Sequence, residues 1–413
     1  MPTATASTSS ASTRHLRFRG HTNFRQRLIL SCLTGRPVRI DAIRPDDTEP
    51  GIQDFEAGFL RLIEKMTNGT VVEIGYTGTS VSLRPGTISG GDVTHDCGVS
   101  RSVGYYLEWI AVLAPFAKKE VRLTLKGITT GTGDAGVDIL RTVTLPLLSQ
   151  FLPEGTAFAS PLELRVISRG MAPGGGGAVQ FRSPLLPTTS GLRALNFNAT
   201  GRVRRIRGVA SAVRVSPNMA SRLVDSSRGV LGRYIPDLYI FADVFRGEEA
   251  GRSPGFALSL VSTSTTGALQ CAEVLSTPGT PPEEVAEKAS RSLLSEIASG
   301  GCVGRQHQAH ALLLMACGPE DVSKIRLGAL TPTAIQMLRD IKEFTSVVFK
   351  IASANSAGGP AVERPSKAQG QTGSDSEEEE ELEEEDIQTA RIQPQELILT
   401  CVGVGIRGAR KAA

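Results

Sequence analysis

Paired cysteines, aromatic residues and long apolar runs are all scarce in this sequence of 413 residues. Its six cysteines are scattered and form no C-x-x-C pair, which argues against a zinc site and is typical of buried thiols in a reducing compartment. No apolar run approaches the roughly 18 residues that span a bilayer, so no membrane partner is expected. With 40% hydrophobic and 21% charged residues, the chain is expected to fold into several compact units.

Acidic residues are missing from the first 40 positions, where seven arginines lie. Such a start is also typical of a mitochondrial transit peptide, but residues 24–40 are expected to belong to the folded core. Residues 354–387 show the opposite bias, with 11 acidic and two basic residues. With these set aside, 43 basic and 31 acidic residues remain, a body of about +12 that favours polyanionic partners. Ser374 and Ser376 precede the acidic run and are candidate phosphorylation sites.

An internal repeat predicts the fold. Three times a strand and a helix-like stretch are followed by a short basic and apolar strand, beginning at Val38, Val121 and Ile325. A second amphipathic stretch then comes at residues 54–66, 137–148 and 333–344, and each is followed by two more strands. The sequence therefore predicts an α+β fold of three β-α-β-α-β-β units, with helices backing the sheets.

A small α/β domain is expected within the third unit. About 90 residues with their own pattern of strands and helices separate the predicted first strand of this unit, around Arg202–Val209, from its first helix, around Val303–Cys317. The expected boundaries are a disordered tail at 1–13, unit one at 14–85, unit two at 86–187, unit three at 188–209, 300–353 and 391–405, the inserted domain at 210–299, a disordered acidic loop at 354–390, and a basic tail at 406–413.

The stretch Arg169–Phe181, RGMAPGGGGAVQF, adds a fairly specific R-G-x-x-P-x-G-G-G motif. With the three units and the insertion, it resembles the RNA 3′-terminal phosphate cyclase family, most closely the eukaryotic non-cyclising branch. That resemblance implies a nucleolar assembly factor of the small ribosomal subunit, required for early processing of the 18S precursor. The implied partners are precursor rRNA, a nucleolar GTPase, and the proteins and snoRNP of the small-subunit processome.

The cyclases of this family adenylylate a histidine at the start of a helix in the third unit, where this sequence has Thr333. A hydroxyl cannot form the phosphoramidate that an imidazole forms. Their Gly-rich start before the first helix is here Gly20–Gln26, GHTNFRQ, without its acid and most of its glycines. A pseudoenzyme without cofactors is therefore expected. The alternative is an enzyme on the same fold, either a residual cyclase or a metal-independent endoribonuclease that uses Arg339, Asp340 and Lys342.

Candidate RNA contacts come from two basic clusters and one glycine turn. The alternatives to RNA binding are that the arginines on these strands only solvate an exposed face, or that they bind a protein. The turn at 131–136 fits G-x-G-x-x-G but lacks the acid of a dinucleotide site, so it is expected to be structural or to hold a phosphate at a helix start. His307 and His310 lack further ligands, so no metal site is expected. The candidates are Arg17, Arg19, Arg25, Arg27, Arg202, Arg204, Arg205, Gly131 and Gly133.

Overall fold

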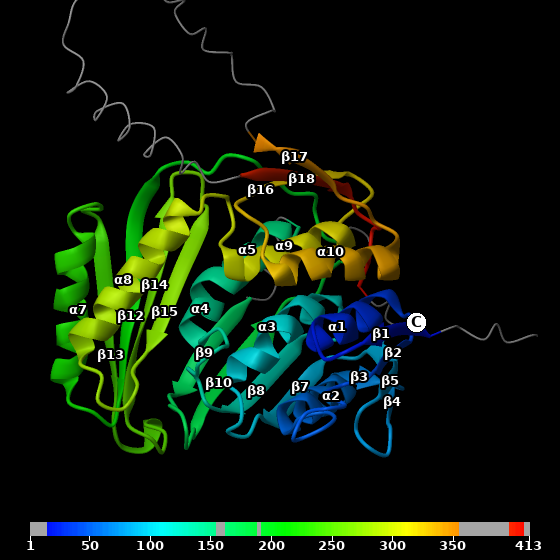
Figure 1. Cartoon of the computed structure of the whole chain (residues 1–413), viewed down its shortest axis with the longest axis horizontal. Coiled ribbons are helices and arrows are strands. Elements are labelled where there is room, and N and C mark those ends of the chain that lie inside the picture. Colours follow the sequence, from blue (N-terminus) through cyan, green and yellow to red (C-terminus); the bar gives the residue numbers. More distant parts are fainter. Residues whose placement is uncertain (1–14, 154–161, 188–190, 355–395, 409–413) are drawn as a thin grey trace, which may run out of the picture.

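Four sheets of four strands each form the framework of the computed structural model, which describes residues 15–153, 162–187, 191–354 and 396–408 (Figure 1). In three of the sheets the first strand lies beside the second, the second beside the fourth, and the third at the far edge. The first pair is parallel and the other pairs are antiparallel in all three sheets. The chain is therefore a mixed α+β protein.

The strands of these three sheets follow one another along the chain. They are β1 (Leu16–Arg19), β2 (Val38–Asp41), β4 (Val71–Ile74) and β5 (Val81–Arg84) in the first sheet; β7 (Gly91–Asp96), β8 (Val121–Gly127), β9 (Glu163–Ser168) and β10 (Gly177–Ser183) in the second; and β11 (Asn196–Phe197), β16 (Val322–Leu327), β17 (Lys350–Ser353) and β18 (Leu397–Val402) in the third. The short strands β3 (Thr67–Asn68) and β6 (Thr87–Ile88) pair separately.

Each of these three sheets packs one face on helices and exposes the other face to solvent. In β8, Val121, Leu123 and Leu125 are fully buried, whereas Arg122 and Lys126 alternate with them on the exposed face. One continuous core joins the three sheets. The helices of this body are α1 (Phe24–Thr34), α2 (Asp54–Met66), α3 (Val103–Leu113), α4 (Val137–Ile139), α5 (Leu145–Phe151), α9 (Gln308–Cys317) and α10 (Pro332–Thr345), with short helical segments η1 (Ala114–Phe116), η2 (Leu140–Thr144) and η4 (Arg305–His307).

The helices are stacked between the sheets. Figure 1 shows α1 and α3 above the first two sheets, and α5, α9 and α10 below β16 and β18. Contacts between α1 and α10 join the two helical layers, and α5 contacts α9 within the upper one. In the described residues no helix is both long and apolar enough to cross a membrane. All six cysteines are buried and free, as predicted.

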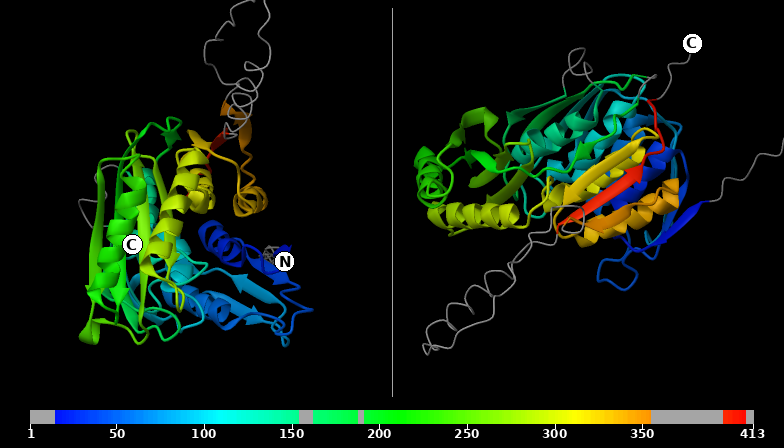
Figure 2. Two further views of the ribbon diagram at one scale, coloured as in Figure 1. Left: turned by 60° about the vertical axis from the view of Figure 1, so that its left-hand side comes forward. Right: turned by 90° about the horizontal axis from the view of Figure 1, so that it is seen from above.

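The fourth sheet belongs to a lobe that projects from one side of the body (Figure 2). Helices α7 and α8 cover one of its faces around a separate core. The stretch Arg202–Val209 was predicted to begin the third unit, but it lies mostly in β12 of this lobe, whereas β11 begins the third sheet. With only two residues, β11 carries no readable alternation. The elements are β12 (Val203–Val213), α7 (Pro217–Leu231), β13 (Leu238–Phe245), β14 (Gly255–Ser264), β15 (Leu269–Leu275) and α8 (Pro282–Ala298), in the order β13-β12-β14-β15.

The glycine-rich stretch after β9 is held against the inserted lobe by hydrogen bonds. The sequence predicts a flexible connection here, but the Gly174 N–H donates to Ser253 Oγ at 2.9 Å and the Arg252 N–H donates to the Gly175 carbonyl at 2.9 Å. A side chain at Gly251 of the inserted lobe would place its Cβ 2.3 Å from the Gly175 carbonyl oxygen. Glycine is needed because the loop packs directly against the backbone of the inserted lobe.

Candidate functional site

A cavity of about 310 Å³ lies where α1, α3, α9 and α10 meet. Its walls come from segments far apart in the sequence, so the fold alone brings them together. Arg25, predicted as an RNA contact, and Thr333, at the position of the missing nucleophile, both line it. The complete lining is Arg25, Gln26, Glu108, Trp109, Gly133, Asp134, Ala135, Arg305, Gln306, Ala309, His310, Thr331 and Thr333.

Arg25 is held in place on one wall of this cavity. Its Nη1 donates to the Tyr105 carbonyl at 2.5 Å and pairs with Glu108 Oε2 at 3.2 Å. Its guanidinium also lies 4.1 Å from the centre of the Tyr105 ring. Arg305 lines the same cavity and is fixed by Glu296 at 2.7 Å. Two oriented guanidinium groups are suited to binding an anion.

His310 is the most buried polar group in the wall. Its ring stacks on Trp109 with centroids 4.1 Å apart, and both ring nitrogens lack a hydrogen-bond partner within the described residues. Burial, together with the charge of Arg25, lowers the pKa of His310 to about 3, so the ring is neutral. Because both nitrogens are shielded from solvent, this imidazole presents no lone pair to a ligand in the cavity.

The start of α10 closes the cavity. The Thr331 hydroxyl caps the helix by accepting from the Ala334 N–H, and Thr331 itself is anchored by Gln308. Thr333 is exposed in the first turn, where the helix dipole favours an anion. The cavity thus offers two arginines, a helix start and a threonine hydroxyl, which together suit a phosphate group.

Arg27 and Asp340 do not have the roles that the sequence suggests. Arg27 is buried, and its Nε pairs with Asp340 Oδ2 at 3.2 Å, so it ties α1 to α10 and does not face an RNA. Asp340 is 1% exposed, whereas Arg339 and Lys342 lie in solvent. Burial raises the pKa of Asp340, although the charge of Arg27 opposes the rise. The structure therefore does not bring Arg339, Asp340 and Lys342 together on one accessible surface.

The glycine turn before α4 contributes one residue to the cavity. Gly133 lines it with φ +83°, while Gly131 packs on Ser102. Asp134 makes a bidentate ion pair with Arg101. At the helix start, the Gly136 N–H donates to Glu273 Oε2 at 2.7 Å, so a carboxylate of the inserted lobe occupies the place predicted for a phosphate.

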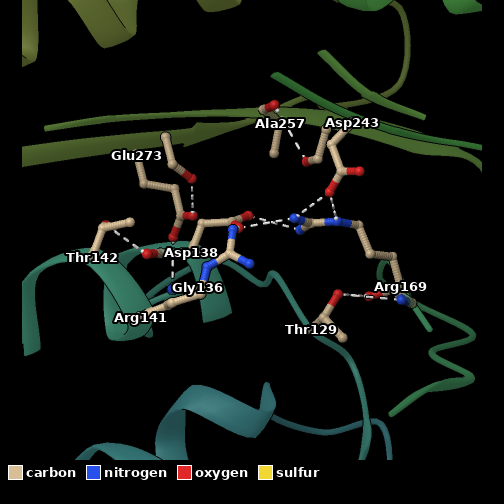
Figure 3. Close-up of polar contacts among 12 residues, drawn as sticks. Thr129, Gly136, Asp138, Arg141, Thr142, Arg169, Asp243, Ala257 and Glu273 are labelled. Atoms are coloured by element: carbon tan, nitrogen blue, oxygen red, sulfur yellow. Dashed lines mark hydrogen bonds and ion pairs between the residues drawn. The ribbon is translucent and has the colours of Figure 1, made fainter. Parts of the chain in front are cut away.

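Arg169, the first residue of the glycine-rich motif, joins the second sheet to the inserted lobe (Figure 3). It is fully buried and makes a bidentate pair with Asp138 at 2.7 and 2.8 Å. A second carboxylate, Asp243 of β13, accepts from its Nε and Nη2 at 2.8 and 2.7 Å. Burial alone would lower the pKa of Arg169, but the two carboxylates raise it, so the guanidinium stays charged.

The remaining candidates lie outside the cavity. Arg17 and Arg19 are exposed on β1, and Arg202, Arg204 and Arg205 are exposed at the start of β12. His307 bonds Thr144 Oγ1 at 2.8 Å in the core, and no cluster that could hold a metal occurs among the described residues. Ser374 and Ser376, the tail at 1–13 and most of the acidic segment lie outside the described residues.

The comparisons identify the class of protein to which this fold and cavity belong. A family model described as RNA 3′-terminal phosphate cyclase matches residues 16–351. The chain therefore belongs to the RNA 3′-terminal phosphate cyclase family.

Individual relatives narrow this class. A Homo sapiens protein described as RNA 3′-terminal phosphate cyclase-like is 47% identical over 341 residues, which cover 81% of this chain and 90% of the human one. A Drosophila melanogaster protein, described as a probable cyclase-like protein, is 38% identical over 404 residues and covers 95% and 96% of the two chains. A Schizosaccharomyces pombe protein described as an rRNA processing protein is 45% identical over 336 residues, covering 81% and 91%.

Several cavity residues carry no clear signal of a binding site in the sequence. Glu108, Trp109 and Arg305 lie on buried or irregular segments without a motif, and for His310 the sequence suggests only an incomplete metal pair with His307. The packing of Trp109 on His310 helps to bring them to one place. Because α3 is buried on all sides, its polar Glu108 was the one available signal.

Proposed function

We propose that this chain is a non-cyclising member of its family that acts in assembly of the small ribosomal subunit, in the nucleolus. It binds precursor rRNA and processome proteins, with a nucleolar GTPase and the snoRNP among its partners, and promotes early processing of the 18S precursor. Its similarity to a protein described as an rRNA processing protein carries this proposal. Depleting the protein from cells should lower 18S rRNA and accumulate its uncleaved precursor.

A structural unit that occurs three times along the chain supports this proposal. The three sheets with one strand order are copies of a β-α-β-α-β-β unit, and the lobe of β12–β15, α7 and α8 is an insertion in the third copy. The unit supplies a scaffold whose original chemistry depended on one side chain at the start of α10. In this chain that position is Thr333, which supports a binding role for the cavity.

Covalent chemistry on ATP gives a direct test. Purified full-length protein incubated with ATP labelled in the α-phosphate should acquire no label, while a cyclising member of the family becomes labelled in parallel. A stable nucleotide adduct on this chain would contradict the proposal, because it would require a nucleophile that Thr333 does not provide.

RNA binding is tested by its dependence on salt. The affinity of the protein for RNA should fall steeply as potassium chloride rises, because arginine contacts to phosphates release counterions. Affinity that is independent of salt, or no binding at all, would contradict an RNA role and would assign the exposed arginines to protein contacts.

A further inference from the structure

One face of the inserted sheet is only half covered. Alternation along the strands directs Ile206 and Ile240 toward α7 and α8, while Tyr239 and Phe241 face the other way. On that outer face β14 and β15 pack against the body, since Val261 and Cys271 belong to the main core. The other half, around Arg207 and Tyr239 at the start of β12 and β13, has no such cover among the described residues, whereas farther along these strands Asp243 pairs with Arg169 and Val213 packs on Met171.

Two aromatic rings occupy this open half. Tyr239 is 56% exposed and Phe241 is 53% exposed, both on β13. They are two residues apart on one strand, so their Cα atoms lie about 7 Å apart. A large aromatic side chain exposed on a sheet face is unfavourable in water and adds nothing to a core. Each ring also presents a face on which an unstacked base can lie.

Arginines flank these rings on the neighbouring strand. Arg207 is the register partner of Tyr239, and Arg205 lies two residues before it on the same face. Arg205 is exposed and has no ion pair within the described part of the chain, while Arg207 keeps a half-exposed guanidinium beside Asp237 at 2.8 Å. A nucleotide stacked on Tyr239 would therefore have its phosphate within reach of positive charge.

We propose that Tyr239, Phe241, Arg205 and Arg207 form a platform for single-stranded RNA. The inference deepens the proposed function, on which it rests, by naming where precursor rRNA would be held. As an edge strand, β13 leaves outward backbone groups that can bond to base edges. Charge favours RNA over a protein strand, because Asp237 and Asp243 are taken by Arg207 and Arg169 and leave no acid on the platform for a basic partner.

The test measures binding of a short fluorescein-labelled oligouridylate to the full-length protein by anisotropy. Replacing both Tyr239 and Phe241 by Ala should weaken binding by at least about tenfold, since stacking contributes about 1–3 kcal/mol per base. The conservative variant Tyr239→Phe should stay within about twofold. The variant Arg205→Ala with Arg207→Ala should lower the salt slope, which the aromatic variants leave unchanged.

Two matched controls lie elsewhere. Tyr76 is fully exposed between β4 and β5, and Arg291 is exposed on α8, on the far side of the inserted sheet. Tyr76→Ala and Arg291→Ala should bind like the wild type. If the wild type binds RNA but the aromatic double variant binds equally well, the platform is wrong and RNA binding stands. If the wild type shows no salt-dependent binding, the proposed RNA role itself fails.

Discussion

The two halves of the outer face of the inserted sheet make opposite use of charge. In the covered half, Glu273 and Asp243 meet the Gly136 N–H and Arg169 of the body. In the open half, Arg205 has no partner within the described residues. Two arginines of this protein thus show two roles: Arg169 is buried and paired with carboxylates that join parts of the fold, whereas Arg205 is exposed and available to a polyanion.

The same contrast recurs at the N-terminal edge. Arg27 is buried against Asp340, whereas Arg17 and Arg19 point into solvent from β1. Spacing along the sequence does not distinguish them, because all three fall in one basic cluster. Their neighbours in space decide which kind each arginine is.

The largest expected effect comes from Arg169. Replacing it by Ala leaves Asp138 buried without its bidentate partner, so the free energy of unfolding should fall by about 3–5 kcal/mol in denaturant titrations. The control is Arg165→Ala, whose pair with Glu163 lies in solvent, so its loss should leave the free energy of unfolding nearly unchanged. Equal effects of the two substitutions would remove the distinction between buried and exposed arginines.

The second-largest loss of stability is expected from the replacement of Arg27. Arg27→Ala should lower the free energy of unfolding by about 3 kcal/mol, because the buried Asp340 loses its charged partner and keeps a neutral donor, Gln336, at 2.9 Å. Arg17→Ala, on the exposed side of β1, should change stability by less than about 0.5 kcal/mol while weakening RNA binding. If Arg27→Ala weakened RNA binding without a loss of stability, Arg27 would be an RNA contact like Arg17 and not a structural residue.

Glu273 makes the free energy of unfolding depend on pH through the covered half of the sheet. Burial, with a contribution from Asp138, raises the pKa of Glu273 from 4.5 to about 7, against the hydrogen bonds from Ser259 and Gly136. A raised carboxyl pKa favours the protonated folded state, so this contribution is fully present below pH 4.5 and is lost as the pH rises through 7.

The variant Glu273→Gln isolates that contribution. Between these pH limits, the stability of the wild type relative to the variant should fall by roughly 2–3 kcal/mol. Glu283→Gln is the opposite control, because the Arg222 pair lowers the pKa of Glu283 and its contribution is lost as the pH falls. A wild type and Glu273→Gln variant with parallel pH profiles would show that Glu273 titrates normally.

The smallest effect on stability is expected in the open half. Replacing Tyr239 and Phe241 together by Ala should move the midpoint of thermal unfolding little, with less than about 0.5 kcal/mol lost per residue, because neither ring packs in a core. A large loss of stability would mean that the rings are structural and would weaken the interpretation of any RNA-binding defect.

Long amphipathic helices could be predicted from the sequence, but short or closely packed features could not. The stretch predicted at 54–66 is α2 residue for residue, since its apolar spacing and capping residues agree. The two residues of β11 gave no signal, and the start of β12 took their place in the prediction. Thr333 was correctly placed at a helix start, yet the cavity around it depends on Glu108, Arg305 and His310, which only tertiary packing gathers.

The ion pair between Arg27 and Asp340 spans 313 residues of sequence. During synthesis at about 5–20 residues per second, α1 therefore leaves the ribosome roughly 15–60 s before α10 can cover it. In that interval the side of α1 that packs on α10 in the finished protein is available to chaperones or to other chains. The order in which the chain is made thus sets a waiting time for this side of α1, which a circular permutant that begins with α10 would abolish.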